Sequence, residues 1–294
     1  MNKYYTKDSC PVCEGSRFEF FLECVDYTVS KEKFKIVKCL DCDMHFTNPI
    51  PYEDHIGEYY KSESYISHSS TNKGIINKLY QIVRKRTLKQ KVGLVSRLAK
   101  GKMALDIGAG TGHFLNAMTE AGFDALGLEP DNDARALAKK TFNVDIQAID
   151  ELCAQQESTF DVITMWHVLE HVYNLKKDLD QIINTLKEDG TLIVAVPNRD
   201  SYDAKYYQSF WAAYDLPIHL YHFNPKNIEQ LFEQYDMKVE EVLPMKFDAF
   251  YVSMLSEKYK HGNLFNAFVR GLLSNVKAKK GTYSSQIYIL KKKS

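Results

Sequence analysis

Four of the six cysteines stand in two Cys-x2-Cys pairs, Cys10 with Cys13 and Cys39 with Cys42. The thiolates of two such pairs can surround one ion tetrahedrally, and this spacing is typical of structural zinc sites. Four protein ligands leave no open coordination position, so we expect the metal to stabilise the fold of residues 1–51 and to take no part in catalysis. The competing interpretations are a disulfide and a chance arrangement of cysteines.

A glycine-rich turn is the second group of residues that could do chemistry. The stretch "MALDIGAGTGHFL" places three glycines behind a short apolar run, at positions Gly108, Gly110 and Gly112. Such a turn lets a ligand approach the main chain closely. Asp106 lies just before it and Glu129 ends the next apolar run, in "LGLEP". One carboxylate suits a cationic amino group, and the other can accept the hydroxyl groups of a ribose. A ligand with these groups and no phosphate fits S-adenosylmethionine, unless both carboxylates only cap helices.

Alternating β-prone and helix-like segments must position these groups. From Lys102 onward, short apolar runs alternate with helical patterns of ten or more residues. This order predicts right-handed βαβ crossovers and a mainly parallel sheet. The closing "YSSQIYILKKK" is expected to be a strand antiparallel to its neighbour. Residues 246–282, before it, are too many for a plain hairpin loop, and we expect them to form a helical insertion.

Residues 101–294 resemble the class I S-adenosylmethionine-dependent methyltransferases. The matching stretches are "LDIGAGTGHFL", "GLEP", "FDVITMWHVLEHV" and "GTLIVAVPN". The resemblance implies an α/β, Rossmann-like domain with a mostly parallel seven-stranded sheet and an antiparallel last strand, here preceded by a small zinc-ribbon subdomain. A zinc-ribbon start on such a domain is similar to bacterial sugar C-methyltransferases. The chain ends near the seventh strand, without their further C-terminal domain, so their substrate is not carried over.

The resemblance also implies which residues meet the cofactor. The glycine turn and Asp106 would hold its amino acid moiety, and Glu129 its ribose. Ile149 and Asp150 would flank the adenine, while Trp166 and His167 would line the site near the methyl group. The expected cofactor site consists of Asp106, Gly108, Ala109, Gly110, Gly112, Phe114, Glu129, Pro130, Ile149, Asp150, Trp166 and His167.

The stretch "FWAAYDLPIHLYHFNP", residues 210–225, follows the fifth expected strand, where class I enzymes build the acceptor side. His219 is the first candidate for a general base, because imidazole can accept a proton near neutral pH. The other candidates are His167, His171, Tyr221 and His222. Alternatively, His219 only hydrogen-bonds this loop to the body. No "NPPY"-type tetrapeptide follows the fourth strand, which favours an oxygen or carbon acceptor over the amino groups of nucleic acids.

The formal charge of zero hides two basic segments. Residues 73–102 hold ten Lys and Arg and no acidic residue, and residues 261–294 hold seven and none. Both also carry apolar residues at helical spacing. The simplest interpretation is that the apolar faces pack on the body and the charges are solvated. The alternatives are a peripheral membrane contact, with residues 246–282 as a lid and docking helix for a lipid-linked substrate, or RNA binding.

Taken together, the sequence predicts a cytoplasmic enzyme, because no apolar run could span a bilayer or serve as a signal peptide. Its expected parts are the zinc ribbon (1–51), a linker with a basic helix (52–100) and the methyltransferase domain (101–294). The expected reaction transfers a methyl group from S-adenosylmethionine to an oxygen or carbon of a small-molecule, glycan-precursor or lipid-linked acceptor. The alternatives are an RNA-modifying methyltransferase and a non-catalytic binding protein with a cofactor fold; the sequence does not indicate an oligomeric state.

Overall fold

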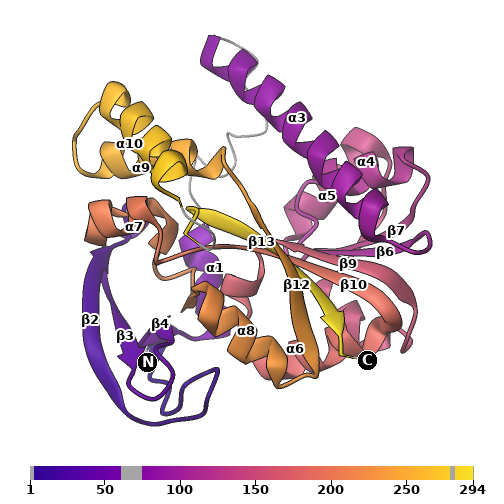
Figure 1. The fold of residues 1–294 in the computed structure, drawn as a ribbon, viewed down its shortest axis with the longest axis horizontal. Helices are drawn as coiled ribbons and strands as arrows, with labels where there is room; N and C mark the ends of the chain where they lie inside the picture. The colour runs from indigo at the N-terminus through magenta and orange to yellow at the C-terminus, as the bar shows by residue number, and fades with distance from the viewer. Residues whose placement is uncertain (1–2, 61–74, 279–281, 294) are drawn as a thin grey trace.

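A seven-stranded sheet forms the centre of the computed structural model, which describes residues 3–60, 75–278 and 282–293. The strand order is β12-β13-β10-β9-β6-β7-β8 (Figure 1). Its members are β6 (Met103–Ile107), β7 (Asp124–Leu128), β8 (Ile146–Gln147), β9 (Phe160–Trp166), β10 (Leu186–Pro197), β12 (Met237–Pro244) and β13 (Ser285–Lys292). Strand β13 runs antiparallel to β10 and β12, and the other neighbouring pairs are parallel. The expected Rossmann-like sheet with an antiparallel last strand is therefore confirmed.

Helices cover both faces of this sheet (Figure 1). One face carries α3 (Ile75–Leu98), α4 (His113–Glu120) and α5 (Asn132–Phe142), and the other carries α6 (Leu175–Thr185) and α8 (Pro225–Glu233). Central strands are mostly apolar because both of their faces are buried, as β9 shows with six buried residues, four of them apolar, followed by Trp166. Side chains of Asp131 and Asn224 cap the first turns of α5 and α8.

One element boundary differs from the sequence-based expectation. The helical pattern of "LKKDLDQIINTLKEDG" predicts a helix through Gly190, followed by a strand from Thr191. In the structure α6 ends at Thr185, and β10 begins at Leu186, which pairs with Phe160 of β9. Pairing with the neighbouring strand outweighs the local helix propensity of these residues.

The N-terminal residues form a second sheet that includes a strand from far along the chain. Its order is β11-β4-β3-β2, with β2 (Phe18–Val25), β3 (Lys33–Cys39), β4 (His45–Thr47) and β11 (Tyr221–His222). The short strands β1 (Tyr4–Tyr5) and β5 (Ile50–Pro51) pair beside it, and α1 (Glu53–Tyr60) follows. Strand β11 belongs to the expected acceptor loop and pairs antiparallel with β4. The cysteine-bearing segment and this loop therefore share one sheet.

Short helices connect the remaining elements. The 3-10 turns are η1 (Ile149–Ala154), η2 (Leu169–His171), η3 (Gln208–Phe210) and η4 (Ala212–Tyr214), and α7 (Tyr202–Tyr207) precedes η3. Between β12 and β13 lie α9 (Asp248–Tyr259) and α10 (Leu264–Lys277), so the expected insertion is helical. A Cβ on Gly271 would lie 2.9 Å from the Cα of Phe250, so glycine allows close packing of α10 on α9.

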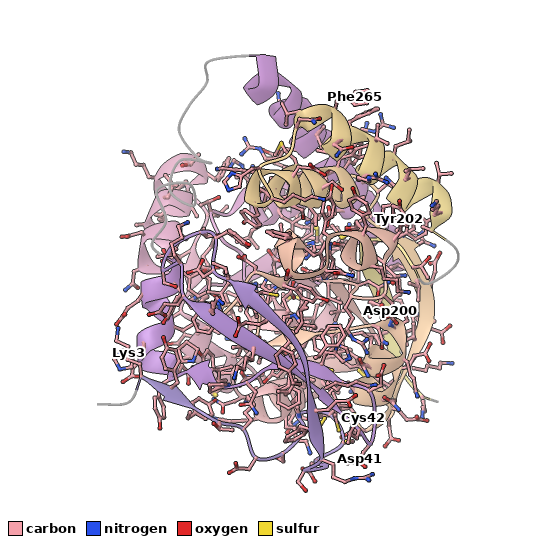
Figure 2. All side chains as sticks on the ribbon, turned by 90° about the vertical axis from the view of Figure 1, so that its left-hand side faces the viewer. Lys3, Asp41, Cys42, Asp200, Tyr202 and Phe265 are labelled. Atoms are coloured by element: carbon pink, nitrogen blue, oxygen red, sulfur yellow. The ribbon has the colours of Figure 1, made fainter. Side chains whose placement is uncertain are left out.

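Buried hydrogen bonds hold this insertion in place. Asp203 of α7 is fully buried and accepts hydrogen bonds from Ser274 of α10 (2.6 Å), Ser284 (2.6 Å) and the indole of Trp211 (2.8 Å). Figure 2 shows Phe265, on α10, and Cys42, in the N-terminal region, at opposite ends of the molecule. Among the described residues, no helix combines the length and the apolar character needed to cross a bilayer.

Candidate functional site

The candidate cofactor site lies where parallel strands end side by side. Asp106 stands in β6, Glu129 directly follows β7, and Trp166 ends β9. In an open parallel sheet, ligands bind outside these carboxyl ends. The amides of Gly108 and Ala109 donate to the carbonyl of the last residue of β7, at 2.8 and 3.0 Å, which folds the glycine turn over the sheet.

The three glycines of the turn have different roles. A Cβ on Gly108 would lie 2.4 Å from Val168, and one on Gly112 would lie 2.8 Å from Ala138. These two glycines are therefore required by protein packing. Gly110 also has a positive φ, of 53°, but apart from its chain neighbours no atom of the described residues lies within 4 Å of its Cβ position. The space beside its main chain is therefore open, and a ligand could approach the backbone closely there.

Two backbone amides fix the carboxylate of Glu129. Gly110 donates to its Oε2 at 2.8 Å, and Asp131 donates to its Oε1 at 3.0 Å. Burial raises the pKa of Glu129, although both hydrogen bonds act in the opposite direction. The capping alternative does not hold, because α4 begins at His113 after Gly112, without a side-chain cap, and α5 is capped by Asp131.

Asp106 lies close enough to Lys91 of the basic helix α3 for their charges to interact, without a direct ion pair among the described residues. The carboxylate is buried and accepts a hydrogen bond from Thr164 Oγ1 at 2.6 Å. Burial raises its pKa to about 7. Lys91 Nζ lies 4.2 Å from the centroid of the Trp166 ring, a cation–π contact. Burial lowers the pKa of Lys91 to about 8, although the charges of Asp248 and Asp106 favour its protonated form.

The other expected cofactor residues surround this pair in different environments. Ala109 and Phe114 are buried, and the Phe114 ring meets Trp166 edge-on at 5.5 Å. The indole Nε1 of Trp166 is buried without a hydrogen-bond partner among the described residues. Ile149, half-buried, opens η1 after β8, while Asp150 and Pro130 are exposed.

His167 stands between two carboxylates. Its Nδ1 lies 3.3 Å from Glu170 Oε1, and its Nε2 lies 3.0 Å from Asp248 Oδ2, the first residue of α9. Burial alone would lower the pKa of His167, but these hydrogen bonds outweigh it and raise the pKa to about 9. The imidazole is therefore protonated at neutral pH, which suits it to holding the two carboxylates together and not to accepting a proton.

His219, unlike His167, is expected to be neutral. It is buried, and its Nδ1 donates to the carbonyl of Ala213 at 2.9 Å, which leaves Nε2 with a free lone pair. Burial lowers its pKa well below the usual value, so the ring is neutral at pH 7. The ring of His171 meets it edge-on at 4.6 Å.

Glu170 completes a small polar cluster with these two histidines. Its side chain is 1% exposed, and its Oε2 has no hydrogen-bond partner among the described residues. One ligand atom from each of Glu170, His171 and His219 lies within 4.8 Å of the others. Such a set could receive a substrate hydroxyl group or hold a divalent cation.

Tyr221 and His222 lie in the N-terminal sheet. The Tyr221 hydroxyl is directed to the carbonyl of Tyr173 at 3.4 Å, and burial raises its pKa. The Nε2 of His222 lies 3.1 Å from Thr47 Oγ1 of β4. These contacts favour a packing role for both side chains over proton transfer.

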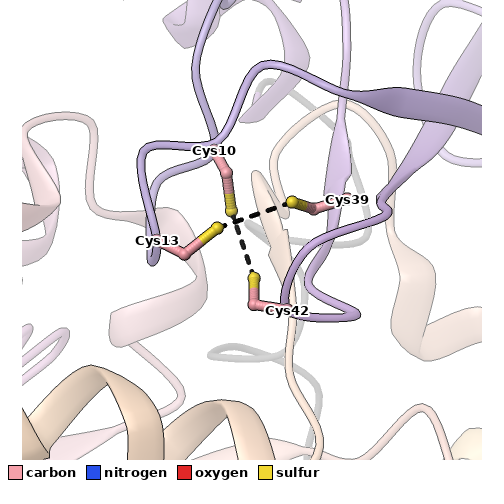
Figure 3. A group of neighbouring side chains, drawn as sticks. All are labelled: Cys10, Cys13, Cys39 and Cys42. Carbon is pink, nitrogen blue, oxygen red and sulfur yellow. Dashed lines mark hydrogen bonds between the residues drawn. The ribbon is translucent and has the colours of Figure 1, made fainter.

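The four cysteines of the N-terminal segment converge on one another (Figure 3). The sulfur atoms of Cys10 and Cys42 are 3.5 Å apart, those of Cys13 and Cys39 are 3.6 Å apart, and all four lie within 4.8 Å of one another. Ligand sulfurs around a tetrahedral zinc ion, with Zn–S bonds of about 2.3 Å, are separated by about 3.8 Å. The donor set and its spacing therefore fit zinc.

The two cysteine turns are built alike. The amide of Cys10 donates to Gly15 and its carbonyl accepts from Glu14, and Cys39 repeats this pattern with Met44 and Asp43. The fourth residue after each leading cysteine has a left-handed backbone, with φ of 62° at Glu14 and 64° at Asp43. This repetition matches two equivalent halves of a single metal site.

Side chains of the main domain hold the second turn. The buried Arg199 donates to the carbonyl of Asp43 at 2.5 Å and to its Oδ2 at 2.8 Å. Asn227 of α8 donates to the carbonyl of Cys42 at 3.2 Å. The cysteine cluster is thus joined to the helix layer under the main sheet.

Four site residues were not predicted from the sequence: Lys91, Thr164, Glu170 and Asp248. Lys91 was part of a basic segment whose charges we expected to be solvated, and Asp248 was part of the expected insertion. Thr164 lies between two apolar residues of β9 and is aligned with Asp106 in the neighbouring strand. Glu170 stood within the stretch "FDVITMWHVLEHV" that carries the family resemblance.

The sheet order and the glycine turn define a Rossmann-like methyltransferase fold. The chain belongs to the methyltransferase domain family, whose model matches residues 80–242. A magnesium protoporphyrin IX methyltransferase from Synechocystis PCC 6803, solved with bound SAH, shares the fold with a TM-score of 0.53 at 11% identity, over 82% of this chain and all of that one. A putative sarcosine dimethylglycine methyltransferase from Galdieria sulphuraria has a TM-score of 0.52 at 12% identity, over 72% of this chain and 86% of that one.

Curated relatives cover a smaller part of the chain. A ubiquinone biosynthesis O-methyltransferase from Glaesserella parasuis is 34% identical over 110 residues, which are 34% of this chain and 47% of that protein. The human mitochondrial ubiquinone biosynthesis O-methyltransferase is 25% identical over 166 residues, 51% of this chain and 45% of that protein. The chain thus spans about half the length of the curated relatives it matches.

Proposed function

We propose that the protein binds S-adenosylmethionine at the ends of β6 and β7 and transfers its methyl group to an oxygen atom of a small-molecule acceptor. The observation that carries this proposal is the open main chain of Gly110 between the carboxylates of Asp106 and Glu129. Asp106 would meet the amino acid end of a sulfonium nucleoside, and Glu129 would meet its ribose. The family and the SAH-bound structural relative support the same ligand.

The charges of the site also suit the amino acid end of this ligand. An amino acid moiety carries both an ammonium group and a carboxylate. Asp106 can accept the ammonium group, and Lys91, which lies over Trp166 and interacts electrostatically with Asp106, can pair with the carboxylate. Glu129 keeps an acceptor position on each oxygen for the ribose hydroxyl groups, because each oxygen receives a single amide.

His219 is our candidate for the general base. When bound, S-adenosylmethionine supplies an electrophilic methyl group on a sulfonium sulfur. The free Nε2 of His219 can take the proton that the acceptor hydroxyl loses as its oxygen bonds to the methyl carbon, while the carbon–sulfur bond breaks and a neutral thioether leaves. The unpartnered Oε2 of Glu170 can accept the same hydroxyl in the resting complex and thereby orient it. His167, charged and held by two carboxylates, would keep α9 in register with β9.

The O-methyltransferase names of the curated relatives favour oxygen over carbon as the methylated atom. They also favour a small molecule over RNA as the acceptor. The basic helix α3 adds support, because Lys91 faces the cofactor pocket and Val95 is buried.

Isothermal titration with S-adenosylmethionine tests the cofactor proposal. Asp106→Asn keeps the shape and the acceptor for Thr164 but loses the charge, so we expect about thirtyfold weaker binding, given roughly 2 kcal/mol for a charged hydrogen bond. Asp161→Asn is the matched control, since Asp161 is equally buried at the opposite end of β9. Absence of binding heat with the unmodified protein would refute the proposal and favour a non-catalytic fold.

We further propose that the four cysteines hold one structural zinc ion. It would tie the two cysteine turns together within residues 1–51 and add folding free energy to a segment with a small core. Elemental analysis is expected to find one zinc per chain, and Cys13→Ser is expected to reduce that content strongly. A fully metal-free protein that keeps its thermal stability would contradict this assignment.

A further inference from the structure

The outward face of α10 is a continuous apolar surface. Its exposed residues recur along one side of the helix, within an arc of about 120° at 100° per residue. They are Leu264 (64% exposed), Phe265 (77%), Phe268 (59%), Leu272 (45%) and Val276 (72%). We call these five residues the α10 stripe. Solvent-exposed clusters of this size mark contact surfaces more often than chance.

The helix is not loosely attached, so the exposure of the stripe is a property of the fold. The opposite side of α10 carries Ala267, Gly271 and Ser274, all buried. Gly271 packs against the backbone of α9, and Ser274 donates to the buried Asp203. The small residues therefore face the protein, and the large apolar ones face outward.

The charges around the stripe favour an anionic surface as its partner. The acidic residues of the α9–α10 hairpin turn inward, Asp248 to His167 and Glu257 to Tyr207. The exposed ionisable residues of this hairpin, within the described part of the chain, are basic: Lys246, Lys258, Lys260, His261 and Lys277. Exposed Phe247, just before α9, and exposed Met254, on α9, stand between Lys246 and Lys258 in the sequence.

The chemistry of the stripe distinguishes a membrane from a protein partner. None of its five side chains can donate or accept a hydrogen bond. Contact with the apolar part of a lipid layer requires no hydrogen bonds, whereas a specific protein interface normally includes polar pairs and Arg or Tyr anchors. We propose that α10 inserts this stripe into the interfacial layer of a membrane that contains anionic lipids, with the nearby lysines at the headgroups.

The hairpin also connects this surface to the candidate site. Its first residue, Asp248, bonds to His167 at 3.0 Å, and α9 leads from there to the stripe. A protein docked through α10 would therefore hold its acceptor site near the membrane surface. This second step rests on the proposed function and assigns to it an acceptor that is anchored in, or partitions into, lipid.

Vesicle flotation tests the docking step. The full chain is mixed with phosphatidylcholine vesicles, either pure or containing 30% phosphatidylglycerol, at low and at physiological salt. We expect binding to the anionic vesicles, and at least about a tenfold fall in the partition coefficient for Phe265→Ser/Val276→Ser, which removes the two most exposed side chains. Phe20→Ser is the matched control, because Phe20 on β2 is 62% exposed but lies outside the hairpin, and it is expected to bind like the unmodified protein.

Two results would overturn the docking proposal. One is equal vesicle binding by the unmodified protein and the double variant. The other is that the unmodified protein does not bind vesicles and elutes as a dimer, while the double variant elutes as a monomer. This result would assign the α10 stripe to contact with a second copy of the chain. Titration with S-adenosylmethionine in the same samples separates the proposals: cofactor binding without vesicle binding refutes docking alone, and the reverse refutes the proposed function alone.

Discussion

The helices α3 and α10 are alike in sequence and opposite in the structure. Both contain Lys and Arg but no acidic residue, and both carry apolar residues at helical spacing. In α3, Val95 is fully buried against the main sheet and Lys91 contacts Trp166, one of the expected cofactor residues. In α10, the large apolar residues face solvent and small ones face the protein. A basic amphipathic helix can therefore be part of a core or of a contact surface, and the size of the residues on each side decides which.

The sharpest test of this contrast is to place the same charge on both helices. Val95→Asp is expected to lower the free energy of unfolding by about 3 kcal/mol, because a carboxylate would be buried without a partner. Leu272→Asp, on the α10 stripe, is expected to change it by less than about 0.5 kcal/mol. Denaturant unfolding measures both. Similar losses in the two variants would show that the α10 stripe is covered in solution.

The lysines of the two helices offer a second comparison. Lys91 lies over Trp166 at 4.2 Å, and Lys277 lies over Tyr202 at 4.4 Å, so their aromatic contacts are closely matched. Lys91→Met is expected to weaken S-adenosylmethionine binding about tenfold, since a partner for the ligand carboxylate is lost. Lys277→Met is expected to leave it unchanged. Calorimetric titration measures the affinity of each variant for S-adenosylmethionine. Equal affinities of the two variants would show that α3 takes no part in cofactor binding.

A smaller effect is expected from pH on cofactor binding. Asp106, with its pKa raised to about 7, loses its charge as the pH falls below 7, and Lys91, with its pKa lowered to about 8, loses its charge above 8. The affinity should therefore be highest between these values and fall by up to about tenfold per pH unit on either side. Asp106→Asn should flatten the acid limb and Lys91→Met the alkaline one. A profile that both variants leave unchanged would assign the titration to other groups.

Much of the main domain could be predicted from the sequence, because its signals are local. The alternation of strands and helices gave the sheet, and the antiparallel last strand was expected from its position. The glycine turn and the carboxylates of Asp106 and Glu129 stand at strand ends that a parallel sheet must bring together. The paired cysteines likewise converge as their spacing predicts.

The remaining features depend on contacts between distant segments. The direction of Lys91 depends on how α3 packs, and a run of basic residues does not encode it. The charge states of His167 and His219 depend on Asp248 and on the carbonyl of Ala213, and the sequence pattern shows neither contact. His219 was a plausible base from its position in the acceptor loop, and its role is still a prediction.

The two-residue strand β11 has a consequence for how such proteins can be recombined. It completes the sheet of the cysteine-bearing segment with residues of the acceptor loop, Tyr221 and His222. An N-terminal module grafted from a relative would bring its own β4 and would have to pair it with a foreign β11. Functional chimeras should therefore have to exchange the module and the loop as one cassette, and the two segments are expected to have been inherited together.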